Sequence, residues 1–304
     1  MSRRPSAKPR ITIVGAGNLA IALALSLRAA GYEIEQIVSQ DQPSSLRRSR
    51  RLAREVGATA ATISRARIQS EVVWFCVPDQ AIATAAKSLA ASAHWAGKVA
   101  LHSSGALASD ELAALRSQGA SIASVHPLMT FVPGSRPSLA GVPFALEGDS
   151  AAVRISRRIV KNLGGNAYSI QKKDKAAYHA WGTFLSPLLT ALLVTSEHVA
   201  AAAGIERKTA KKIMLPIVRQ TQANYAAFEA AQAFSGPIIR GDLETVQSHL
   251  RTLRKIPIAR DVYLALARAA VEYLPGKNKN ALQRALKSQR NLAIVSHFQT
   301  LFRY

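Results

Sequence analysis

The sequence has a single cysteine, Cys76, and seven histidines that are widely spaced. One cysteine excludes an internal disulfide framework and any metal site built from several thiolates. Cys76 lies in the apolar run 72–77, where a buried thiol acts as a small hydrophobic side chain. The histidines show neither H-x-x-x-H nor carboxylate spacing. The sequence therefore predicts no metal site.

Acidic side chains are scarce, because 18 Asp and Glu stand against 40 Lys and Arg, a formal net charge of +22. A positive charge of this size suggests nucleic acid or an acidic surface as a binding partner. The basic residues fall on the polar faces of most predicted helices, however, and no aromatic residues are interleaved with them. We therefore expect a generally basic surface and no specific nucleic-acid partner.

The apolar runs are too short for a membrane-spanning helix. Basic residues followed by an apolar segment up to Leu27 resemble a signal peptide, but this segment contains a glycine-rich turn and lacks a small-residue cleavage site. The stretch 182–194 is interrupted by Pro187 and followed by Glu197 and His198, so it is too short to cross a bilayer. We expect a cytoplasmic protein with no membrane partner.

Residues 11–30 contain a strand–turn–helix pattern. Residues 11–14 are apolar and mostly β-branched, two glycines follow at once, and an alanine- and leucine-rich run closes at Gly31. In this setting G-x-G-x-x-A indicates dinucleotide binding, because Gly15 permits the turn and Gly17 lets the backbone approach a pyrophosphate. The helix N-terminus supplies free N–H donors to the phosphates. The expected cofactor-binding residues here are Gly15, Gly17, Asn18, Leu19 and Ala20.

The end of the second predicted strand, 34–38, favours NADP over NAD. Proteins that bind NAD usually carry an acid here, which binds the ribose 2′-hydroxyl. The position falls near Ser39, and Arg47 and Arg48 follow in the next helix. A hydroxyl with arginines suits a 2′-phosphate, because guanidinium pairs with phosphate in a bidentate, charge-assisted way. The other interpretation is a solvated basic helix face. We expect NADPH to be the cofactor, with Ser39 and Arg47 among its ligands.

Strand and helix patterns alternate up to residue 171, and only helix patterns follow. The sequence predicts an α/β fold, a Rossmann-type doubly wound, mostly parallel sheet followed by an all-α C-terminal domain. The expected divisions are a basic flexible tail over 1–10, a dinucleotide-binding Rossmann-like domain over 11–171, and a helical substrate and dimerisation domain over 172–304.

Several residues suited to binding follow consecutive predicted strands, at the point where each strand ends. Carboxyl ends of parallel strands meet at one edge of a sheet, where doubly wound proteins hold their ligands. We expect Val77 and Pro78 to line the nicotinamide ribose. Ser103 and Ser104 either hydrogen-bond the cofactor or substrate or satisfy the backbone of a local turn.

His126, Arg240 and Ser104 are the expected catalytic residues. His126 is either a proton donor or substrate ligand, because a histidine can titrate near neutral pH, or a structural histidine bonded to backbone. Arg240 either binds a substrate carboxylate or pairs with an acid at a subunit contact. Asp242 is well placed to cap the next helix, and His249, two turns along that helix, is expected to be structural.

Four short runs of the sequence resemble the Rossmann-like oxidoreductases of unassigned function. They are Val-Gly-Ala-Gly-Asn-Leu-Ala at 14–20, Val-Pro-Asp at 77–79, His-Ser-Ser-Gly at 102–105 and Val-His-Pro-Leu at 125–128. Tyr-His-Ala at 178–180 and the run 236–242, with His249, resemble their C-terminal partner, domain-of-unknown-function family 2520.

More distantly, the chain is similar to pyrroline-5-carboxylate reductase and the β-hydroxyacid dehydrogenases. Lys175 lies near the place of the dehydrogenases' lysine, but Tyr178 and His179 stand where their asparagine would be sought. The resemblance therefore implies the fold and the cofactor and leaves the substrate open.

The expected function is that of an NADP-dependent oxidoreductase, which transfers a hydride between nicotinamide and a small, carboxylate-bearing carbonyl or imine compound. The alternative is a non-catalytic NADP-binding sensor or partner protein, because the lysine–asparagine pair is not clearly present. Helices such as 184–194 are apolar around much of their circumference. They predict a homodimer formed through the helical domain.

Overall fold

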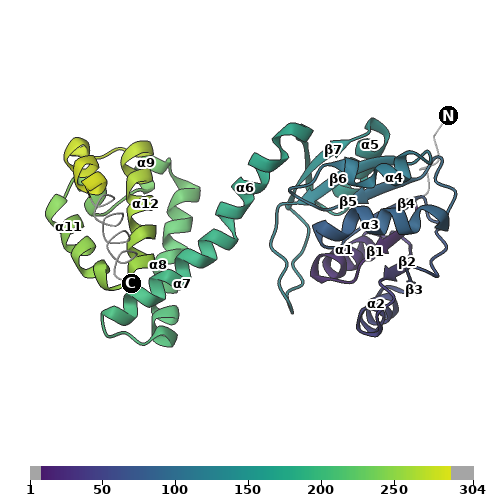
Figure 1. The fold of residues 1–304 in the computed structure, drawn as a ribbon, viewed down its shortest axis with the longest axis horizontal. Helices are drawn as coiled ribbons and strands as arrows, with labels where there is room; N and C mark the ends of the chain where they lie inside the picture. Colours follow the sequence, from purple (N-terminus) through teal and green to yellow (C-terminus); the bar gives the residue numbers. More distant parts are fainter. Residues whose placement is uncertain (1–7, 289–304) are drawn as a thin grey trace, which may run out of the picture. The chain divides into compact units, whose positions relative to one another are not determined.

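The computed structural model describes residues 8–288, and its first part is built on one eight-stranded sheet (Figure 1). The strands are β1 (Ile11–Val14), β2 (Ile34–Ser39), β3 (Thr59–Thr62), β4 (Val72–Phe75), β5 (Val99–His102), β6 (Ser121–Pro127), β7 (Pro143–Gly148) and β8 (Asn166–Ser169). Their spatial order is β3-β2-β1-β4-β5-β6-β7-β8, and every neighbouring pair is parallel except β6 with β7. This confirms the predicted Rossmann-type sheet.

Helices cover both faces of the sheet. In this part of the chain they are α1 (Asn18–Ala29), α2 (Pro43–Val56), α3 (Asp79–Leu89), α4 (Ala113–Arg116), α5 (Ser150–Asn162) and α6 (Lys175–Leu185). One hydrophobic cluster joins the sheet to α1, α2 and α5, and a second joins it to α3 and α4. The central strands β1 and β4 are buried along their whole length. β4 is an unbroken apolar run, and in β1 the one polar side chain, Thr12, accepts a hydrogen bond from Ser70 at 2.8 Å. The strand order reverses between β1 and β4, which makes the edge beside them the place where such folds hold ligands.

The chain divides into two compact units, the first ending at Ser186 and the second beginning at Pro187. The boundary expected at 171 placed α6 in the second unit, whereas α6 belongs to the first. The reason is that Lys175 and Tyr178 of α6 are buried, and Lys175 bonds to groups at the ends of β5 and β6. The sequence pattern over 178–203 predicts one helix, but the structure has two there, because Pro187 opens a new one.

The second unit is helical throughout its described residues, as the sequence predicts. Its helices are α7 (Pro187–Ala202), α8 (Arg207–Ala227), α9 (Ala230–Ala233), α10 (Pro237–Arg240), α11 (Leu243–Thr252) and α12 (Pro257–Tyr273), and residues 279–288 are helical as well. Asp242 caps α11 by accepting a hydrogen bond from the backbone N–H of Thr245 at 3.0 Å, as expected. His249 Nδ1 lies 3.1 Å from the Tyr263 hydroxyl, so it links α11 to α12. Most of the predicted tail, 1–10, lies outside the described residues.

Candidate functional site

The turn between β1 and α1 requires glycine at Gly15 and leaves open space beside Gly17. Gly15 has φ +114°, and a Cβ added there would lie 2.3 Å from the carbonyl oxygen of Cys76. A Cβ added at Gly17 would meet none of the described atoms within 4 Å. In the described chain no side chain caps the start of α1. The first N–H groups of the helix are therefore left for a ligand, and an anion is the group that a helix N-terminus favours.

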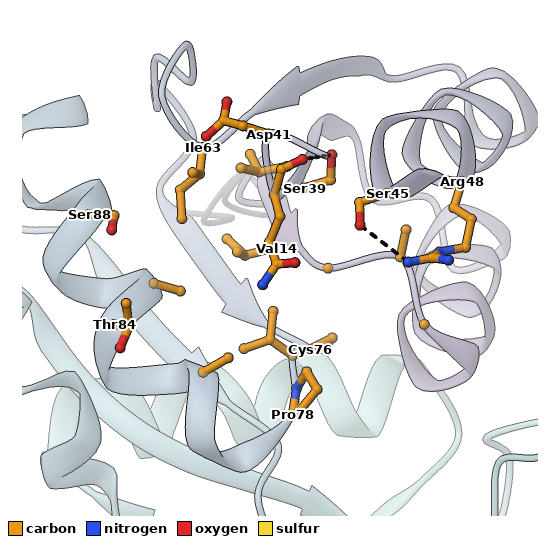
Figure 2. A pocket seen from close by; sticks show the side chains of 18 of the residues that line it. Val14, Ser39, Asp41, Ser45, Arg48, Ile63, Cys76, Pro78, Thr84 and Ser88 are labelled. Carbon is orange, nitrogen blue, oxygen red and sulfur yellow. Dashed lines mark hydrogen bonds between the residues drawn. The ribbon is translucent and has the colours of Figure 1, made fainter. Parts of the chain in front are cut away.

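A cavity of about 800 Å³ opens from this turn at the reversal of strand order. Gly15, Gly17 and Asn18 form one wall, and Val77 and Pro78, which follow β4, form another. Figure 2 shows Ser45 and Arg48 of α2 on one side of the cavity and Thr84 and Ser88 of α3 on the other. The turn, the strand ends and the two helices thus enclose a volume that suits a dinucleotide.

Arg48 rather than Arg47 lines this cavity. Consecutive helical residues point about 100° apart, so only one of the two faces the cavity from α2. The Arg48 guanidinium donates to the Ser45 hydroxyl at 3.2 Å (Figure 2). The assignment of Arg47 as a cofactor ligand is corrected on this ground.

The end of β2 contributes both a serine and an acid. Ser39 lines the cavity but is only 6% exposed, and its hydroxyl accepts from Ser49 at 3.2 Å and donates to the carbonyl of Gln40 at 3.3 Å. Asp41, two residues beyond the strand, also lines the cavity, and hydrogen bonds from Ser64 and other neighbours lower the pKa of its carboxyl. The sequence argument counted no acid at this strand end and overlooked Asp41.

A second group of polar residues lies at the ends of β5 and β6. The Ser103 hydroxyl accepts a hydrogen bond from Trp74 Nε1 at 2.8 Å. The Ser104 hydroxyl accepts from the backbone N–H of Ala106 at 3.2 Å and of Leu107 at 2.9 Å, and Ser104 is 5% exposed. This is the local serine turn that the sequence left open as the alternative. The Ser104 hydroxyl is thus occupied as an acceptor by its own turn, and its catalytic role stays a prediction.

His126, at the end of β6, pairs with a tyrosine from α6. Its Nδ1 atom lies 2.7 Å from the Tyr178 hydroxyl. Burial, followed by the positive charge of Lys175, lowers the pKa of His126 to about 4, and burial raises the pKa of Tyr178. Both side chains are therefore neutral near pH 7, and two hydrogen-bonding forms fit the contact: the tyrosine O–H donates to Nδ1 with the imidazole proton on Nε2, or Nδ1–H donates to the tyrosine oxygen.

The Nε2 atom of His126 faces a glycine. A Cβ added at Gly105 would lie 2.9 Å from Nε2 and 2.9 Å from Cδ2 of His179. Glycine is therefore the residue that lets these two rings converge. The Nε2 atom of His126 and the exposed ring of His179 border the same small region.

Lys175 is a buried cation beside this group. It is 2% exposed and donates to the Ser104 carbonyl at 3.0 Å and to the Ser124 hydroxyl at 2.6 Å, and burial lowers its pKa to about 8. The site assignments from sequence missed Lys175 and Tyr178. Lys175, Tyr178 and His179 are spaced i, i+3 and i+4, which places them on one face of a helix. This spacing was the signal in the sequence that could have identified them.

The structure brings together part of the predicted site. Gly15, Gly17, Asn18, Ser39, Val77 and Pro78 line the cavity. Within residues 8–288 the lining does not include Leu19, Ala20, Ser103, Ser104 or His126. Ala20 is fully buried in α1, and His126 lies two strands along the same carboxyl edge. Arg240 is exposed at the end of α10 in the second unit, and its part in a site stays a prediction.

Two family models match consecutive parts of the chain. Residues 3–127 match the Rossmann-like domain, and residues 142–270 match DUF2520, a domain of unknown function. The chain combines a Rossmann-like domain with a DUF2520 domain. The resemblance seen in the sequence motifs is thereby confirmed for both halves of this Rossmann-like–DUF2520 protein.

Solved structures with the same fold extend over both domains. A candidate NADP oxidoreductase from Bacteroides fragilis is 21% identical, with 86% of this chain and 97% of that chain covered and a TM-score of 0.72. A protein from Thermotoga maritima is 25% identical, with 92% and 99% covered and a TM-score of 0.68. A pyrroline-5-carboxylate reductase from Coxiella burnetii is 16% identical, with 88% and 98% covered and a TM-score of 0.55. No curated protein matches the sequence significantly.

Proposed function

We propose that this Rossmann-like–DUF2520 protein is an NADP-dependent oxidoreductase that reduces or oxidises a small carbonyl or imine compound. The observation that carries the proposal is the cavity built on Gly15, Gly17 and the uncapped start of α1. The fold shared with the structures from B. fragilis and C. burnetii supports it. When bound, the nicotinamide supplies or accepts a hydride.

The preference for NADP rests on Arg48. Its guanidinium faces the cavity beside Ser45 and close to the end of β2, where the adenosine ribose of a dinucleotide lies in this fold. A 2′-phosphate would receive a charge-assisted hydrogen bond there. Asp41 opposes this preference, because a carboxylate repels phosphate and accepts from a ribose hydroxyl. The basic surroundings on α2, with five exposed arginines, weigh toward phosphate.

His126 is proposed to bind the substrate through Nε2–H. In this proposal the Tyr178 hydroxyl is the donor to Nδ1, so that Nε2 keeps its proton and can donate to a carbonyl oxygen or an imine nitrogen. Such a donor stabilises the charge that develops on that atom during hydride transfer. Since the pKa of His126 is about 4, the residue acts as a neutral hydrogen-bond donor rather than as an imidazolium acid. Lys175, which carries the nearby positive charge, favours the same build-up of negative charge.

Arg240 remains the proposed ligand of a substrate carboxylate. It is an exposed guanidinium between Ile239 and Gly241, and bidentate pairing with a carboxylate is the contact that guanidinium geometry suits. Arg240→Lys should raise KM for a keto acid and leave KM for the corresponding amide unchanged, because an ammonium cannot form the bidentate contact.

The experiment that tests the proposed function is a screen of keto acids and cyclic imines for oxidation of NADPH, followed by absorbance of the reduced nicotinamide. Turnover of at least one compound, lost in His126→Asn, is the expected result. NADPH binding without turnover of any compound would support the sensor alternative instead.

We also propose that the protein is a homodimer through its helical unit. None of the described residues of α7 is buried, and its Leu188 and Leu189 side chains are 47% and 45% exposed. By length and composition alone the helical run 172–202 also passes as a membrane span. Lys175 and Tyr178 in that run are buried in the first unit, however, so the whole run does not lie in a bilayer. This favours a second copy of the chain, rather than lipid, as the contact partner of the apolar side chains of α7.

A further inference from the structure

The connection between β6 and β7 is much longer than its geometry requires. The two strands are antiparallel neighbours, which two residues can join, yet residues 128–142 lie between them and none of these described residues belongs to a helix or strand. Long connections of this kind are commonly functional. The loop is anchored by Leu139, which is 1% exposed, and by Phe131, which packs against the core.

This loop folds back onto the helices that carry the cofactor turn. The Phe131 carbonyl accepts a hydrogen bond from the side-chain amide of Asn18, the first residue of α1, at 3.3 Å. Arg136 forms an ion pair with Glu55 of α2, and its second nitrogen lies 3.4 Å from the other carboxylate oxygen. The loop that joins β6 to β7 therefore contacts both α1 and α2.

A smaller cavity of about 280 Å³ lies between the loop and these helices. Its walls include Asn18 and Arg48, which also line the dinucleotide cavity, so the two cavities adjoin. The remaining charged residues of the lining are Arg51 and Glu55 of α2 and Arg136 of the loop. Three guanidinium groups thus face one carboxylate, which leaves an excess of positive charge beside the place proposed for the adenosine ribose.

We propose that the β6–β7 loop completes the subsite for the 2′-phosphate of NADP, and that Arg136 is a specificity residue for that phosphate. The inference rests on the proposed function and adds a group from a loop distant in sequence. In the structure Glu55 holds Arg136 at the edge of the smaller cavity. A phosphate seated beside Arg48 and Arg51 competes with Glu55 for the Arg136 guanidinium, because it offers the same bidentate geometry with more charge.

The test compares two variants that break the same ion pair from opposite sides. Arg136→Ala removes a cation and should weaken binding of adenosine 2′,5′-bisphosphate about tenfold, whereas Glu55→Gln removes the competing anion and should strengthen it severalfold. Adenosine 5′-monophosphate lacks the 2′-phosphate, so its affinity should change less than twofold in either variant. Arg50→Ala is the matched control, because Arg50 is an exposed arginine of α2 outside the lining of both cavities.

The direction of the two effects decides the outcome. If the ion pair only holds the loop in place, both variants lower the affinity for both nucleotides by the same factor, and the proposal is overturned. It is also overturned if Arg136→Ala leaves the bisphosphate affinity unchanged while the unmutated protein still prefers the bisphosphate; the NADP proposal then stands on Arg48 alone. If the unmutated protein binds neither nucleotide, the proposed function fails with it.

Discussion

The Nδ1 atom of His126 and the hydroxyl of Tyr178 lie 2.7 Å apart, although 52 positions separate them in sequence. One residue ends a strand of the sheet, and the other lies one turn into α6. In the proposed tautomer the hydroxyl donates to Nδ1, which leaves the Nε2 proton of His126 for a ligand. The hydrogen bond also explains why α6 belongs to the first unit, since it fixes Tyr178 at the sheet edge.

Tyr178→Phe should lower kcat roughly ten- to hundredfold and leave NADPH affinity unchanged. The variant removes the donor to Nδ1, so His126 no longer favours the Nε2–H tautomer, and a positioned donor contributes on this order. Steady-state kinetics together with an NADPH titration measures both effects. Tyr263→Phe is the matched control, because it removes a tyrosine–histidine hydrogen bond of the same kind in the second unit. Equal losses in the two variants would contradict the role of Tyr178.

The protein should lose stability as the pH falls from about 6.5 to about 4. Burial first of all lowers the folded-state pKa of both His102 and His126 to about 4, while an unfolded histidine titrates near 6.5. Between these values the unfolded state binds more protons than the folded state, so unfolding becomes easier as the pH falls. The effect is at most about 3 kcal/mol for each histidine.

Urea denaturation at several pH values measures this dependence. His126→Asn should reduce the slope of unfolding free energy against pH in the same window. An unchanged slope in the variant would show that His126 does not stay neutral in the folded protein.

Arg48→Ala should weaken NADPH binding roughly ten- to hundredfold and change NADH affinity little. The variant removes a charge-assisted bond of about 1.5–3 kcal/mol to the 2′-phosphate. Arg47→Ala, one position earlier on α2 and outside the cavity lining, should leave both affinities nearly unchanged. Isothermal titration calorimetry measures the affinity of each variant for NADPH and for NADH. A larger effect from Arg47 than from Arg48 would contradict the placement of α2.

Leu189→Glu should convert the dimer to a monomer. A carboxylate on the apolar face of α7 has to be desolvated at a subunit contact, which costs several kcal/mol when it has no partner. Mass measurement by light scattering, without detergent, distinguishes the two states. Gln118→Glu adds the same charge to an exposed position of the first unit and should leave the mass unchanged. A monomeric unmutated protein at micromolar concentration would refute the dimer.

The sequence predicts the fold well where local patterns are strong. The strand–turn–helix pattern over 11–31 and the second strand, 34–38, were predicted because buried strands and glycine turns leave clear signals. β3 was missed because Thr59–Thr62 is short, weakly apolar and at the sheet edge. The residues of the site were harder to predict, since their roles depend on side-chain direction.

Three cases illustrate that limit. Arg47 and Arg48 differ by one helical step, which a charge pattern does not resolve. The Ser104 hydroxyl accepts hydrogen bonds from the backbone of its own turn, and the sequence did not distinguish this turn from a ligand contact. Lys175 and Tyr178 contact His126 and Ser124 only after long-range folding, so their spacing alone did not reveal their partners.

The central claim is that the cavity between the Gly15–Asn18 turn, α2 and α3 binds NADP. The most direct test is a fluorescence titration of the unmutated protein with NADPH and with NADH at physiological salt. We predict saturable binding of NADPH that is at least about tenfold tighter than binding of NADH, the factor expected from one charge-assisted contact to phosphate. Equal affinities would contradict the NADP assignment, and failure to bind either dinucleotide would contradict the oxidoreductase itself.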